Sequence, residues 1–351
     1  MKKLIGSMAG LLLFLGVWAP ETAAVAAGEA LQLCTHTLIP SLFPFFVCSN
    51  LFVASGLANV VGSRLERPFF RLFGIRGAGV SAILLGFCSG YPSGAAVAAR
   101  LYLGGQISKS EAHRLLAFTN NPSPLFVLGV IGTGVYGHAK AGYLLLSAIV
   151  LSSVFTGICM RTWGGKGEER RGQKKTRLSD PMEAAIGTAL RLCGFVIFFA
   201  VVAAFSERTG LLPLIRRALI QFGCGEKTAA MLVDGILEVS ALSGKAGALP
   251  AMAGLLSLGG VSVFLQVWDI ARRAGLSVRS FLVGKLLSGG FAALFCRLML
   301  LFVPVTTETA VSGEKIICFG AYLGIVTLGS VGLYAIFRVM QYFRDKKRQA
   351  V

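Results

Sequence analysis

Charged residues are scarce in this sequence, and acidic residues are the scarcest. Only 14% of the 351 residues are charged, with 16 acidic against 34 basic side chains. A soluble domain carries about 25% charged residues, so a chain that is 55% hydrophobic, with a mean hydropathy of +0.73, is no ordinary soluble domain. Apolar runs of about 20 residues recur along it, each long enough to cross a bilayer core. The sequence therefore predicts an all-α polytopic membrane protein.

Residues typical of metal and catalytic sites are few or wrongly spaced. The three His stand at 36, 113 and 138 without a His-Glu-x-x-His pattern, and none of the eight Cys forms Cys-x-x-Cys. The cysteines are typical of small buried hydrophobic residues. No Ser-His-Asp set, paired carboxylates or ATP-binding motif is found. We therefore expect no enzyme, no metal and no cofactor, and any energy for transport has to come from a gradient, a trap or a partner.

Basic residues, in contrast, are abundant and give a net charge of +18. They lie mainly in the loops between apolar runs, as the positive-inside rule describes. This placement favours contacts with anionic lipids at the basic loops and argues against a nucleic-acid partner. Net charge alone does not establish an anionic substrate.

The pattern of apolar runs and basic loops predicts about eight transmembrane helices plus two re-entrant hairpins. Residues 1–20 begin with a basic pair and form either an uncleaved first helix, which we favour, or a signal peptide. The basic stretch 161–177 divides the chain into halves, and residues 211–222 are expected to lie flat as an amphipathic helix. The predicted units are an N-terminal helix and outer loop (1–37), a first repeat (38–160), a basic cytoplasmic linker (161–188), a second repeat (189–303) and a C-terminal helix with a basic tail (304–351).

Two apolar segments of the first half are interrupted. Residues 86–95 (GFCSGYPSGA) place three Gly, a Pro and two Ser inside a long apolar run, and Asn120, Asn121 and two prolines interrupt residues 115–135. Broken helices survive in lipid only where they are buried in protein or line a cavity. Interruptions paired between two halves of a chain indicate a transporter's substrate site. For residues 115–135 an ordinary proline kink is the alternative.

The second half repeats this order weakly. A Ser/Gly-rich break at residues 240–248 corresponds to the first break, and residues 259–264 correspond to residues 120–126. The predicted topology starts the first unit from outside and the second from inside, which makes an inverted repeat.

Candidate site residues are the polar and ionisable groups at these breaks, because such groups are costly at membrane depth. A glycine break between Glu238 and Lys245 is expected to bring them together, with Lys245 attracting an anion and Glu238 coupling transport to H⁺ or Na⁺. The alternative is a structural ion pair. Tyr91 either stacks on an aromatic substrate or has a packing role. The predicted substrate-binding residues are Ser89, Gly90, Tyr91, Ser93, Asn120, Asn121, Ser123, Ser243, Lys245 and Ser262, and the predicted coupling residues are Glu238 and Asp234.

Residues 86–95 together with residues 119–126 (TNNPSPLF) resemble the YlbJ (SpoVV) family of sporulation integral membrane proteins. That family belongs to the group with nucleoside-recognition "Gate" domains, which is related to concentrative nucleoside transporters. The resemblance implies a transporter with two hairpins around a central site, made in the outer forespore membrane during sporulation. It also implies dipicolinic acid, a small aromatic dianion, as the cargo.

Other functions stay open at this point. Transport of a nucleoside or another small metabolite is one alternative, although Ser-Gly-Tyr-Pro stands where nucleoside transporters carry Gln-Thr-Glu. A non-transporting scaffold of spore assembly is another, although it has no need for broken helices. Whether the chain forms a homo-oligomer is also left open.

Overall fold

The computed structural model describes residues 10, 14, 16–164 and 180–303, and every regular element within them is helical. This confirms the predicted all-α fold. Three predicted parts of the chain lie outside the described residues. They are most of the first helix, residues 165–179 of the basic linker, and the C-terminal helix with its basic tail (304–351).

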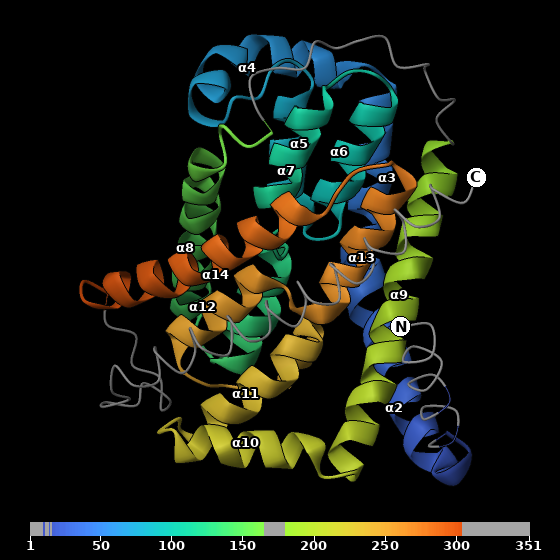
Figure 1. Cartoon of the computed structure of the whole chain (residues 1–351), viewed down its shortest axis with the longest axis vertical. Coiled ribbons are helices and arrows are strands. Elements are labelled where there is room, and N and C mark those ends of the chain that lie inside the picture. Colours follow the sequence, from blue (N-terminus) through green and yellow to red (C-terminus); the bar gives the residue numbers. More distant parts are fainter. Residues whose placement is uncertain (1–9, 11–13, 15, 165–179, 304–351) are drawn as a thin grey trace, which may run out of the picture.

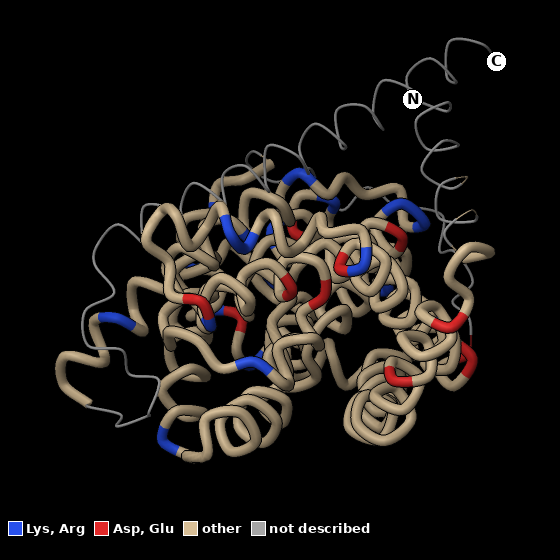
Figure 2. Tube along the Cα trace, turned by 90° about the horizontal axis from the view of Figure 1, so that it is seen from below, with Lys and Arg blue, Asp and Glu red and all other residues tan. Residues whose placement is uncertain are grey.

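Five helical stretches in the described part of the chain are long and apolar enough to cross a membrane. They lie at Pro20–Ala54, Ala139–Cys159, Pro181–Arg208, Leu249–Arg273 and Arg279–Leu300. Charged residues are widely spaced along the trace, with long uncharged stretches between them (Figure 2). The chain is therefore a polytopic membrane protein.

The first of these stretches corrects the predicted outer loop at residues 21–37. α2 (Pro20–Leu33), a π-helical segment η1 (Cys34–Leu38) and α3 (Ile39–Ala54) follow one another without a gap. Pro20 is the first residue of α2, a position where its missing N–H costs nothing. The Ala-rich sequence that follows favours a helix over a loop. The π-helical segment stands just before Pro40, and such segments often occur at functional sites.

Two of the long helical stretches, one in each half, are followed by an amphipathic helix. α3 leads into α4 (Leu57–Phe73), and α9 (Pro181–Arg208) leads into α10 (Leu211–Gln221). The connecting residues, Gly56 and Gly210, both have φ of +79°, which a glycine adopts without strain. The amphipathic helix predicted at residues 211–222 is thus confirmed as a helix, whereas the helix α4 was not predicted.

Three segments are interrupted. α5 (Gly79–Ser89) and α6 (Ser93–Leu103) form the predicted hairpin around a cis Tyr91–Pro92 peptide bond. Residues 119–125 separate α7 (Lys109–Phe118) from the π-helical η2 (Phe126–Val135), which precedes α8 (Ala139–Cys159). The third segment comprises α11 (Glu226–Leu237), the 3₁₀ helix η3 (Val239–Gly244) and α12 (Leu249–Leu258), and it continues through two glycines into α13 (Gly260–Arg273).

The two halves run in opposite directions. α2 and α3 lead to α4 at one end of the molecule, whereas α9 leads to α10 at the other end (Figure 1). The order of long helix, glycine, amphipathic helix and broken segment is common to both halves. The arrangement has the opposed directions of an inverted repeat, while the boundaries of the repeats stay a prediction.

The halves interlock through α14 (Arg279–Leu300), which packs against α7, α8 and α12. The approach to α7 is close because Gly284 faces the backbone of Ala117, and a Cβ at Gly284 would overlap the Ala117 carbonyl. A second link is a hydrogen bond of 2.8 Å from the Tyr136 hydroxyl to the carbonyl of Gly247. These two contacts add to the packing of α2 and α3 against α9, so the halves are joined at several places.

The close crossing of α14 and α7 gives a first prediction. Gly284→Ala should lower the free energy of unfolding by about 1–3 kcal/mol, because the added methyl group has to displace backbone. Thermal unfolding of the purified protein in detergent measures the change. Gly290→Ala is the matched control on the same helix, because no atom lies within 4 Å of its added methyl group. An unchanged Tm for Gly284→Ala would contradict the described packing.

Candidate functional site

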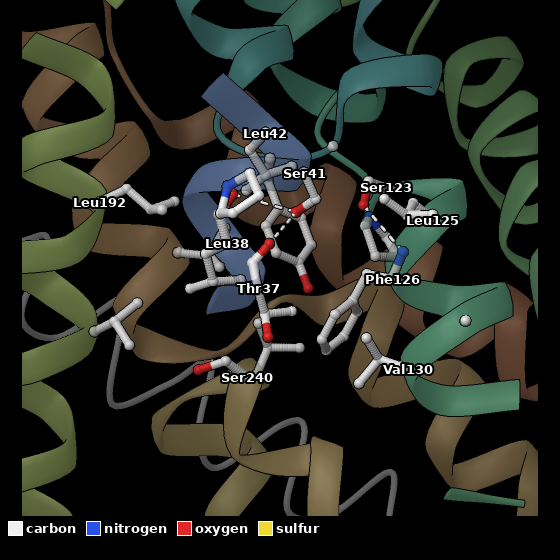
Figure 3. Close-up of a pocket in the computed structure, with 18 of the residues that line it drawn as sticks. Thr37, Leu38, Ser41, Leu42, Ser123, Leu125, Phe126, Val130, Leu192 and Ser240 are labelled. Carbon is white, nitrogen blue, oxygen red and sulfur yellow. Dashed lines mark hydrogen bonds between the residues drawn. The ribbon is translucent and has the colours of Figure 1, made fainter. Parts of the chain in front are cut away.

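The three interrupted segments meet at one cavity of about 420 Å³. One wall is the π-helical segment and the start of α3, and the opposite wall is the second break with η2 (Figure 3). α9, α13 and the breaks at residues 90–91 and 238–240 complete the lining. The lining residues are His36, Thr37, Leu38, Pro40, Ser41, Leu42, Gly90, Tyr91, Pro122, Ser123, Leu125, Phe126, Gly129, Val130, Leu192, Val196, Glu238, Val239, Ser240, Val263 and Gln266.

Three buried polar atoms of the lining have no hydrogen-bond partner among the residues that the structure describes. They are the hydroxyl of Tyr91, Oε2 of Glu238 and Oε1 of Gln266. The three residues are only 9%, 5% and 4% exposed. Buried polar groups in proteins are almost always hydrogen-bonded, and leaving one unpaired costs about 1–3 kcal/mol. These atoms are therefore the groups that a bound molecule would satisfy.

Glu238 is fixed by the break in which it lies. It caps the N-terminus of η3, where its Oε1 accepts hydrogen bonds of 3.0 Å from the backbone N–H and from the hydroxyl of Ser240. The cap uses one carboxylate oxygen and leaves the other without a partner. No Lys or Arg is among the described residues that line the cavity, and none of the described residues forms an ion pair with this carboxylate.

Lys245 does not lie where the sequence predicts. Its ammonium binds the carboxylate of Asp234, which also accepts a 3.0 Å hydrogen bond from Arg216. After η3 the chain turns back along α11, and the N–H of Ala248 donates to the Thr228 hydroxyl. This return path places Lys245 beside Asp234. The predicted juxtaposition of Glu238 and Lys245 is wrong, and neither Lys245 nor Asp234 lines the cavity.

Asn120 and Asn121 stabilise the second break and do not line the cavity. Oδ1 of Asn120 accepts a 2.8 Å bond from the N–H of Ala95 in the hairpin, and its amide donates to the carbonyl of Leu116. Asn121 donates to the carbonyl of Phe118 and accepts a 2.7 Å bond from the Ser153 hydroxyl. These bonds join α6, α7 and α8 and satisfy backbone groups at the break.

The remaining predicted serines are distributed around the cavity. Ser123 lines it, whereas Ser89 lies behind the lining and shares a 3.3 Å hydrogen bond with Ser49. Ser262 accepts a 3.2 Å bond from the Gln266 amide, and Ser93 and Ser243 are outside the lining. Of the twelve predicted residues, the cavity lining brings together Gly90, Tyr91, Ser123 and Glu238.

The sequence reasoning missed one buried charge next to the site. Lys285 lies on α14 and is 3% exposed. Its ammonium donates to the carbonyl oxygens of Asn120 and of Ser257, the latter at 2.7 Å, and lies 5.9 Å from the ring centroid of Tyr91. An ionisable residue inside the apolar run 281–303 was the signal that could have identified it. Gln266, a polar residue among apolar neighbours in the second predicted repeat, carried a similar signal.

These features define a multi-pass membrane protein whose broken helices meet at a partly polar internal cavity. No family model and no solved structure matches the chain. The sporulation integral membrane protein YlbJ of Bacillus subtilis (strain 168) is 30% identical over 327 residues, which cover 82% of this chain and 79% of the relative. The chain therefore belongs to the YlbJ family of sporulation integral membrane proteins.

The hydrogen bonds of the second break give a further prediction. Asn120→Ala should destabilise the fold by about 1–3 kcal/mol, because it leaves the buried N–H of Ala95 without an acceptor. Thermal unfolding of the purified variants gives the comparison. Asn59→Ala, at an exposed position of α4, is the control and should leave the Tm unchanged. Equal Tm values for the two variants would mean that Asn120 is free of this structural role.

Proposed function

We propose that the protein transports a small organic metabolite across a membrane of the sporulating cell, with the outer forespore membrane as its location. The observation that carries the proposal is the convergence of three helix breaks on a cavity with three unpaired buried polar atoms. Broken helices that meet near the middle of a membrane protein are typical of secondary transporters. A scaffold gains nothing from leaving polar atoms unpaired at such a depth.

The cavity has the dimensions of a site for a small molecule. Its volume of about 420 Å³ falls in the usual range for ligand pockets, roughly 300–1,000 Å³. Aliphatic side chains and the rings of Tyr91 and Phe126 form much of the lining. Such walls suit a flat ring, and the unpaired polar atoms suit substituents that form hydrogen bonds.

We propose dipicolinate as the first cargo to test, because of the family to which the chain belongs. The lining sets a condition on such a dianion, since it holds Glu238 and no Lys or Arg. A proton on the free carboxylate oxygen of Glu238 would remove the repulsion and donate a hydrogen bond to the cargo. Transport is thus expected to be coupled to H⁺ through Glu238. His36 and Tyr91 are the other titratable side chains of the lining.

An uncharged metabolite such as a nucleoside is the second candidate. The absence of Lys and Arg from the lining favours it, because a neutral cargo needs no compensating charge there. Its hydroxyl and amino groups would donate to the free oxygens of Glu238 and Gln266.

Uptake of labelled dipicolinate and labelled nucleosides into proteoliposomes, with and without an inward proton gradient, tests the proposal. Gln266→Leu should weaken cargo binding about tenfold, because it removes a buried hydrogen-bond acceptor. Glu238→Gln keeps a donor but no titratable proton, so uptake should persist and lose its response to the gradient. Both effects are measured as initial rates at several cargo concentrations.

Lys245→Gln is the control variant, because Lys245 lies outside the cavity and should leave uptake unchanged. Loss of dipicolinate uptake in this variant alone would restore the earlier assignment of Lys245 as the anion-binding residue. Folded protein that moves neither cargo faster than empty liposomes would favour a scaffold role.

A further inference from the structure

Lys285 is a buried cation without a carboxylate partner in the described part of the chain. Two of its ammonium protons point to the carbonyl oxygens of Asn120 and Ser257, and the ring of Tyr91 lies nearby. A buried charge usually needs an opposite charge or strongly polar partners. Among the described residues, its hydrogen-bond acceptors are two main-chain carbonyls, as around many bound metal ions, and the Tyr91 ring is a further neighbour.

The two carbonyls are free for reasons that the sequence explains. Asn120 follows the end of α7, and the residue four positions later is Pro124, which has no N–H to donate to it. Ser257 lies in the last turn of α12, which ends at the left-handed Gly259. The last carbonyls of a helix have no partner within it and form the negative end of the helix dipole. Lys285 therefore lies at the C-terminal ends of two helices, one from each half, and binds a last-turn carbonyl of α12 and the carbonyl of the residue after the C-cap of α7.

We propose that these carbonyls form a monovalent-cation site that is filled by the chain's own lysine. Secondary transporters commonly bind Na⁺ through the carbonyls of unwound segments and half-helix ends, and an ammonium is a compact charge with three N–H donors. Lys285 thus replaces a soluble ion with a tethered one. The protein needs no Na⁺ or K⁺ at this position, and the site keeps its affinity for a small cation when the lysine is removed. This inference does not depend on the cargo.

Chemical rescue of Lys285→Ala tests the site. n-Propylammonium reproduces the part of the side chain that Ala lacks, namely three carbons and the ammonium. The variant should melt on the order of 5 °C or more below the wild type, because two buried carbonyls lose their donor. Propylammonium or an alkali cation at about 100 times its dissociation constant should then restore the Tm by a similar amount, whereas choline at equal ionic strength should not.

The wild type and Lys245→Ala are the matched controls, and neither should respond to propylammonium beyond the response to choline. A folded Lys285→Ala protein that gains no more from propylammonium or alkali cations than from choline overturns the inference. If Lys285→Ala does not fold, Lys285→Gln decides, because Gln keeps an N–H donor and loses the charge. A Gln variant as stable as the wild type overturns the cation site, and one that is destabilised and regains its Tm with alkali cations supports it.

Discussion

Every backbone polar group inside a bilayer needs a hydrogen-bond partner from the protein itself, and the structure around the cavity depends on this constraint. The chain breaks its helices at three places and has to satisfy the groups that are set free. The side chain of Asn120 accepts a hydrogen bond from a backbone N–H of the hairpin, and Glu238 caps the start of η3. The ammonium of Lys285 donates hydrogen bonds to two backbone carbonyls. Among the described residues, one oxygen each of Tyr91, Glu238 and Gln266 is left unpaired at the cavity, where a bound molecule can form hydrogen bonds with it.

Much of the fold could be predicted from the sequence, because apolar runs, basic loops and glycine- or proline-rich breaks are local signals. The hairpin at Tyr91–Pro92 and the interruption after Phe118 lie where those signals place them. The loop expected at residues 21–37 was wrong. This stretch is less apolar than the runs on either side of it, and that difference alone suggested a loop. There the helix propensity of alanine prevails.

The candidate site was harder to predict, because partners across a break depend on the path of the chain. Glu238 and Tyr91 line the cavity as predicted, since both lie at a break. Lys245 forms an ion pair with Asp234 because the chain returns along α11 after η3. The number of residues between two side chains does not reveal such a path. Lys285 lies in an uninterrupted helix, so the pattern of breaks did not indicate it. Its ammonium nevertheless binds carbonyl oxygens of two other segments, those of Asn120 and Ser257.

Hydrogen bonds between the halves also constrain how they can move. Lys285 of the second half binds the carbonyl of Asn120 in the first, and Tyr136 of the first half binds the carbonyl of Gly247 in the second. Further contacts join the halves, because α3 packs directly against α9 and the N–H of Ser277 donates to Nε2 of His113. A rigid motion of one half against the other would therefore have to break several of these contacts at once.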